Sequence, residues 1–158
     1  MWGQDLDSFT TPLECGRSWR VKFDKNFIGR DALLKQKEEG IKRIYVQLLL
    51  DDHDYEIDIW PSGNEPIYRN GVLCGRTTTT SYGYTFKKQV CLGYIQNVGE
   101  KGILQTVTND YVTHADFEVE ICGLRYPAKI NLHSPTLPSL VPDKDIDERD
   151  RYQATRNK

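Results

Sequence analysis

The sequence predicts a mainly β fold with one helix, in which short antiparallel strands form a small barrel or jelly roll. Short β-branched and apolar runs recur at close spacing after residue 41. Asn70-Gly71 separates two of these runs, which is typical of a tight hairpin because both central residues adopt positive φ. The length of 158 residues and the apolar fraction of 38% are those of one folded domain with its own core.

The N-terminal part predicts one strand and one helix. Residues 1–16 are polar and rich in turn formers, whereas Ser18 to Phe23 alternates between apolar and basic positions. This period-two pattern predicts a strand with Arg20 and Lys22 on its basic face. Residues 30–39 are good helix formers, and Gly40 follows at the position of a left-handed C-terminal cap.

The rest of the chain predicts strands and then a tail. The expected strands are Ile44–Leu50, Ile67–Arg69, Val72–Cys74, Val90–Ile95, Phe117–Ile121 and Leu124–Leu132. Cys122-Gly123 would join the last two as a hairpin. Residues 134–158 combine prolines, dense charge and few apolar side chains, so we expect a disordered tail.

Charge and cysteine content argue against several classes of protein. A net charge of −2 from well-mixed acids and bases argues against nucleic-acid binding. The sequence contains no apolar run long enough for a membrane-spanning helix, and its first ten residues lack a basic stretch followed by an apolar one, so we expect no targeting segment within this chain. The 4 cysteines are widely spaced, so we expect buried free thiols in a reducing compartment.

Two groups of side chains could bind a ligand, each with a structural alternative. Tyr82, Tyr84 and Phe86 alternate and could stack a pteridine or flavin, or form one face of a packed sheet. A basic cluster could hold an anionic tail such as the glutamates of a folate, or be a solvated strand face. This cluster consists of Arg17, Arg20, Lys22 and Lys25.

One histidine and three acidic residues are the candidates for metal binding or acid–base chemistry. His53 within Asp-Asp-His-Asp could be a metal ligand or part of a solvated loop. Glu14 with Asp5 or Asp7 could act as general acid and base. No phosphate-binding loop, dinucleotide-binding glycine pattern, nucleophile elbow or zinc-protease motif is present. We therefore assign no catalytic residue and no metal site.

Several motifs together resemble the aminomethyltransferase (T-protein) family. They are Gly3-Gln4-Asp5-Leu6-Asp7, Thr11-Pro12-Leu13-Glu14, Phe27-Ile28-Gly29-Arg30-Asp31-Ala32-Leu33, Pro66-Ile67-Tyr68-Arg69-Asn70-Gly71 and Leu92-Gly93-Tyr94. The resemblance covers residues 1–133. It implies that residues 1–41 are the end of a folate-binding-type domain and that residues 42–133 are the family's C-terminal barrel.

The resemblance also implies a larger parent protein and leaves two roles open. Sarcosine and dimethylglycine dehydrogenases share the early motifs and join an FAD-dependent half to a tetrahydrofolate-binding half. Residues 51–71 look most like the regulatory subunits of pyruvate dehydrogenase phosphatase, a mitochondrial branch. That branch implies the mitochondrial matrix as location and the phosphatase catalytic subunit as partner.

For this chain we expect a C-terminal fragment that is not catalytic alone, although its parent could be an FAD- and folate-dependent amine dehydrogenase. The upstream half of the polypeptide would carry FAD, the family's catalytic aspartate and most of a composite tetrahydrofolate site. Lys25 lies near a basic folate contact of the family, and Arg20 and Tyr82 are the other candidate folate-binding residues.

Overall fold

The structure is a computed structural model and describes residues 1–132. Its strands are β1 (Arg43–Leu50), β2 (Pro66–Arg69), β3 (Val72–Gly83), β4 (Lys88–Val98), β5 (Leu104–Gln105), β6 (Phe117–Ile121) and β7 (Leu124–Asn131). Two α-helices, α1 (Arg30–Glu39) and α2 (Asn109–Thr113), and 3₁₀ turns at Ser18–Arg20 and Glu100–Gly102 complete the described part.

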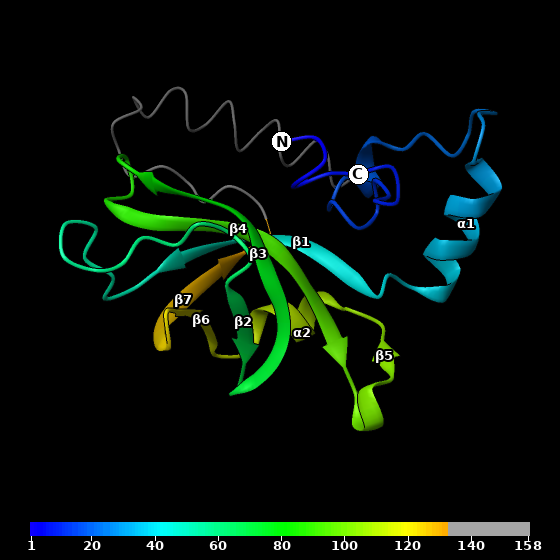
Figure 1. The fold of residues 1–158 in the computed structure, drawn as a ribbon. Helices are drawn as coiled ribbons and strands as arrows, with labels where there is room; N and C mark the ends of the chain where they lie inside the picture. Colours follow the sequence, from blue (N-terminus) through cyan, green and yellow to red (C-terminus); the bar gives the residue numbers. More distant parts are fainter. Residues whose placement is uncertain (133–158) are drawn as a thin grey trace, which may run out of the picture.

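The strands close into an antiparallel barrel. They follow the order β1-β7-β6-β2-β3-β4, and β4 pairs with β1 to complete the ring. The short strand β5 extends β4 outside the ring (Figure 1). The predicted antiparallel barrel is confirmed, and closure leaves the ring without free edges.

Alternating side chains fill the barrel interior. Leu48 of β1, Ile67 of β2, Ile95 of β4 and Val119 of β6 have no exposed surface. The period-two pattern of each strand sends these residues inward and their neighbours outward. Gly93 lets β3 and β4 approach closely, because a Cβ there would lie 2.5 Å from the Arg76 carbonyl oxygen. The barrel interior is therefore a packed hydrophobic core.

Both predicted hairpin turns are confirmed. Asn70 and Gly71 have φ values of 47° and 78°, and Cys122 and Gly123 have values of 49° and 86°. Positive φ at both central residues matches the turn to the twist of the flanking strands.

The cysteines are all free, but the expectation of burial is only partly confirmed. Burial raises the pKa of the Cys74 and Cys91 thiols to about 12, so both are protonated and unreactive. Cys15 is half-buried, and Cys122 is exposed because it lies at the tip of a turn.

The predicted strand at Ser18–Phe23 is wrong. Ser18–Arg20 forms a 3₁₀ turn, and turns and bends connect it to α1. The Arg20 guanidinium lies over its neighbour Trp19, 4.2 Å from the ring centroid. Alternation alone does not make a strand, because a strand also needs an edge to pair with. The closed ring offers none to this segment.

The predicted helix at residues 30–39 is confirmed as α1, which has no buried residue. Gly40 has positive φ (76°) but an extended ψ (149°), so it is not a left-handed cap. We did not predict α2, whose cap is Thr108 and whose Val112 enters the core. No helix in residues 1–132 is long and apolar enough to cross a membrane. The predicted tail at 134–158 lies outside the described residues.

Candidate functional site

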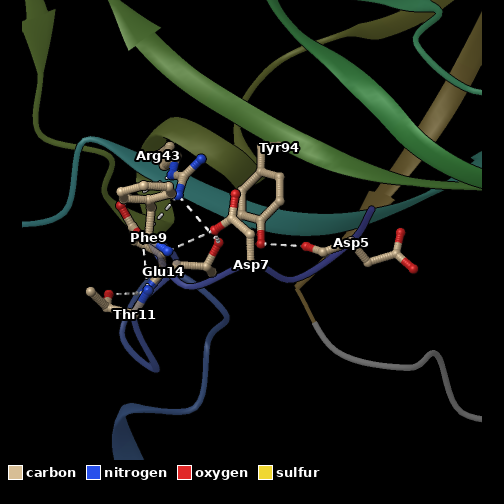
Figure 2. Close-up of polar contacts among 8 residues, drawn as sticks. Asp5, Asp7, Phe9, Thr11, Glu14, Arg43 and Tyr94 are labelled. Atoms are coloured by element: carbon tan, nitrogen blue, oxygen red, sulfur yellow. Dashed lines mark hydrogen bonds and ion pairs between the residues drawn. The ribbon is translucent and has the colours of Figure 1, made fainter. Parts of the chain in front are cut away.

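Residues 1–16, called the N-terminal segment here, lie against the outer wall of the barrel beside β1, β3 and β4. The Tyr94 hydroxyl donates to the Asp5 carbonyl oxygen at 2.7 Å (Figure 2). The Thr78 hydroxyl donates to the Asp5 carboxylate at 2.6 Å. Gln4 Nε2 donates to the Thr78 carbonyl oxygen at 2.6 Å. These bonds join residues more than seventy positions apart in the chain.

The Asp5 carboxylate is buried and held in its charged form. Burial by itself would raise its pKa, but hydrogen bonds from the Met1 ammonium group and from Thr78 outweigh burial and lower the pKa to about 2. Such a group is ionised at neutral pH and cannot donate a proton there. A role as general acid, which the sequence left open, does not fit this environment.

The Thr11-Pro12-Leu13-Glu14 motif forms a capping box. The Thr11 N–H donates to Glu14 Oε2 at 3.0 Å, and the Glu14 N–H donates back to Thr11 Oγ1 at 3.3 Å. The arrangement leaves Glu14 Oε1 free to face the barrel, where Arg43 Nε donates to it at 3.2 Å. The Glu14 carbonyl also accepts from the Tyr45 N–H at 2.8 Å. Glu14 is therefore a structural latch between the segment and β1.

Arg43 is the centre of this latch. Its guanidinium bonds Glu14 and the Thr10 hydroxyl, and it lies 4.7 Å from the centroid of the Tyr94 ring (Figure 2). Burial opposes the charge, but the hydrogen bond and charge of Glu14 raise the pKa of Arg43 above its usual value. Asp7 lies nearby, and its hydrogen bond from Thr10 lowers its pKa.

A cavity of about 580 Å³ lies between the segment and the barrel. Its charged and aromatic lining comes from Asp5, Asp7, Arg43, Arg76 and Tyr94. Two guanidinium groups could bind carboxylates, and the Tyr94 ring offers an apolar face. The arrangement can bind a small polar or zwitterionic molecule, but it does not pair a nucleophile with a base.

The structure does not gather the predicted folate-binding residues at this cavity. Arg20 and Lys25 are exposed on the connection before α1. Tyr82 lies near the end of β3, where its ring stacks against Tyr55 at 4.2 Å. None of the three is among the residues that line the 580 Å³ cavity.

His53 is built into a loop. Its Nε2 lies 3.2 Å from the Ile59 carbonyl oxygen, and its ring packs edge-on against Tyr126 at 5.0 Å. Within residues 1–132, no three His, Cys, Asp or Glu side chains are placed to hold a metal ion.

Sequence reasoning named Asp5 and Glu14 but missed their partners Arg43, Thr78 and Tyr94. The Thr-x-x-Glu spacing is a capping-box signal and could have identified the Glu14 turn. Nothing local marks Arg43 or Tyr94, because their role depends on which strand lies beneath the segment.

The closed antiparallel barrel with a latched segment on its wall defines the class of protein as a small β-barrel domain. Residues 43–136 match the glycine cleavage T-protein C-terminal barrel domain, and the chain belongs to this family.

The chain is similar to mitochondrial proteins that are much longer. It is 49% identical over 138 residues to the mouse mitochondrial pyruvate dehydrogenase phosphatase regulatory subunit, covering 85% of this chain and 16% of that protein. It is 36% identical over 132 residues to human mitochondrial dimethylglycine dehydrogenase, covering 82% of this chain and 13% of that protein. The chain thus spans less than a fifth of either relative.

A solved aminomethyltransferase T of the glycine cleavage system from Bartonella henselae has the same fold. The TM-score is 0.62 at 22% identity, covering 85% of this chain and 34% of that one.

Proposed function

We propose that this chain is the C-terminal barrel of a mitochondrial matrix protein of the pyruvate dehydrogenase phosphatase regulatory-subunit type. Its role is to bind the phosphatase catalytic subunit, not to catalyse a reaction. The observation that carries the proposal is the 49% identity over 138 residues to a regulatory subunit, against 36% over 132 residues to an amine dehydrogenase.

The contacts of Asp5 and Glu14 support a role in which these two residues hold the structure and do not catalyse a reaction. Asp5 and Glu14 are engaged by Thr78 and Arg43, so both serve to hold the segment on the barrel. Neither is paired with a nucleophile.

The proposal is tested by calorimetric titration of the chain, and of a longer polypeptide that includes upstream sequence, with the phosphatase catalytic subunit. We expect saturable binding of the chain in the micromolar range, on the order of −8 kcal/mol. Absence of binding by both polypeptides would contradict the proposal.

The second candidate is one wall of a composite tetrahydrofolate site in an amine dehydrogenase whose upstream half carries FAD. The specific observation is the cavity of about 580 Å³ with Arg43, Arg76 and Tyr94 in its lining. Guanidinium groups suit the glutamate tail of a folate.

Titration with tetrahydrofolate and turnover of sarcosine and dimethylglycine by the longer polypeptide separate the two roles. Turnover together with tetrahydrofolate binding would establish the dehydrogenase. Binding of the phosphatase subunit without turnover would favour the regulator. For the chain alone, we expect weak tetrahydrofolate binding or none.

A further inference from the structure

The loop of residues 51–61, which follows β1, exposes apolar side chains although it is rich in acids. The exposed fractions are 82% for Ile57, 61% for Ile59 and 51% for Trp60. Single exposed apolar residues are common on protein surfaces, but three within four positions of one loop form a patch. We propose that this loop and the adjoining end of β3 form a docking surface for a basic, apolar segment of a protein partner.

The loop is ordered by its own hydrogen bonds. Trp60 Nε1 donates to the Tyr55 carbonyl oxygen at 2.6 Å, and the Asp58 N–H donates to the Asp54 carbonyl oxygen at 2.8 Å. The Thr80 hydroxyl ties the loop to β3 by donating to the Pro61 carbonyl oxygen at 2.6 Å. The apolar side chains are thus presented on a fixed backbone, which reduces the entropy lost on binding.

Tyrosine rings extend the patch onto β3. Tyr55 packs on Tyr82 at 4.2 Å, and Tyr84 meets Tyr82 edge-on at 5.1 Å. Tyr84 is 80% exposed. Because Tyr82 already packs against two tyrosines, the stripe suits protein contact better than the stacking of a planar ligand. Aromatic side chains are enriched at the centres of protein interfaces.

The carboxylates around the apolar patch favour a partner segment that is basic. Exposed carboxylates of Asp52, Asp54 and Glu56 border it, while Lys88 is paired with Asp51. A hollow of about 370 Å³ is lined by Asp52, His53, Asp54, Tyr55, Tyr82 and Lys87. A Lys or Arg side chain in this hollow would meet the two carboxylates of Asp52 and Asp54, which outnumber the single positive charge of Lys87, and an aromatic ring. A basic segment with apolar anchors therefore complements the surface in charge and character.

The surface lies at the end of the barrel opposite α1. The loop follows the last residue of β1, whereas α1 precedes its first residue, and Figure 1 shows the loop and the β3–β4 turn on the side away from α1 and β5. Docking there would leave the cavity beside Asp5 accessible.

This inference rests on the proposed function and assigns the surface through which the phosphatase catalytic subunit binds. The experiment is calorimetric titration of the full chain and its variants with that subunit. The double substitution Ile57→Ser and Trp60→Ala should weaken binding at least about tenfold. Asp52→Asn with Glu56→Gln, which keeps the hydrogen-bonding shape, should weaken it less and reduce its salt dependence.

Ile103→Ser is the matched control, because Ile103 is 66% exposed and lies beside β5 at the other end of the barrel. It should leave affinity unchanged, and circular dichroism should show that every variant is folded. If the double variant binds like the wild type, or the control loses as much affinity, the surface assignment is overturned while the regulatory role stands. If neither the wild-type chain nor the longer polypeptide binds the subunit, both proposals fail; if only the longer polypeptide binds, the same substitutions are compared in it.

Discussion

The barrel and the N-terminal segment are held in place by different forces. The barrel interior is made of side chains such as Leu48 and Ile95, which have no exposed surface. The segment buries Leu13 together with two carboxylates, Asp5 and Glu14, whereas α1 has no fully buried residue. Apolar burial therefore stabilises the barrel, whereas directional polar bonds position the segment. The segment should detach under conditions that leave the barrel folded.

The largest expected effect is in the barrel. Leu48→Ala removes a fully buried side chain at the β1–β4 pairing and should lower the free energy of unfolding by about 2–5 kcal/mol, from lost burial and a residual cavity. Urea denaturation measures this. Leu124→Ala is the control, since Leu124 is 60% exposed, and should change the free energy by less than about 0.5 kcal/mol. Equal effects would show that the barrel is not the stabilising core.

Glu14→Ala tests the polar attachment of the segment. Loss of the capping box and of the Arg43 partner should favour local opening by about 1–2 kcal/mol. Hydrogen exchange should rise in residues 1–16 and stay unchanged in β4 and β6. Glu38→Ala, at an exposed position of α1, should leave the exchange of the segment as it is. Faster exchange throughout the barrel would mean that segment and barrel unfold together.

The segment should also be more sensitive to acid than the barrel. Asp5 has a pKa of about 2 in the folded protein, below its ordinary value of 3.8, so its stabilising contribution is present above pH 3.8 and is lost as the pH falls through 2. The opening equilibrium of residues 1–16, followed by proteolysis with pepsin, should shift in this window. Asp5→Asn should remove this pH dependence of the opening of residues 1–16. An unchanged pH profile in that variant would assign the effect to another carboxyl group.

The smallest effect is expected on α1. The Lys35–Glu39 ion pair spans one helical turn, with side chains 74% and 62% exposed. Lys35→Ala should therefore change the unfolding free energy by less than about 0.5 kcal/mol. A thermal melt measures this. A larger loss would indicate that α1 packs against another part of the protein.

Patterns among neighbouring residues predicted the turns and the helix whose conformation depends mainly on those neighbours. Asn70-Gly71 sets positive φ at a hairpin, and the helix formers of 30–39 give α1. The predicted strand at Ser18–Phe23 was wrong because strand pairing depends on an available sheet edge, and an alternating pattern carries no information about that edge. The short helix α2 was not predicted, because the capping role of Thr108 and the burial of Val112 can be recognised only once the helix is seen packed on the barrel.

The sequence by itself determined the barrel family and the hairpin turns, because strand runs and turn chemistry act between near neighbours. It also indicated Asp5 and Glu14, but not what they do. Only the tertiary structure decided that Thr78, Tyr94 and Arg43 meet them, and that Ile57, Ile59 and Trp60 face outward. Those outcomes depend on which distant segments share a surface, and folding alone brings these segments together.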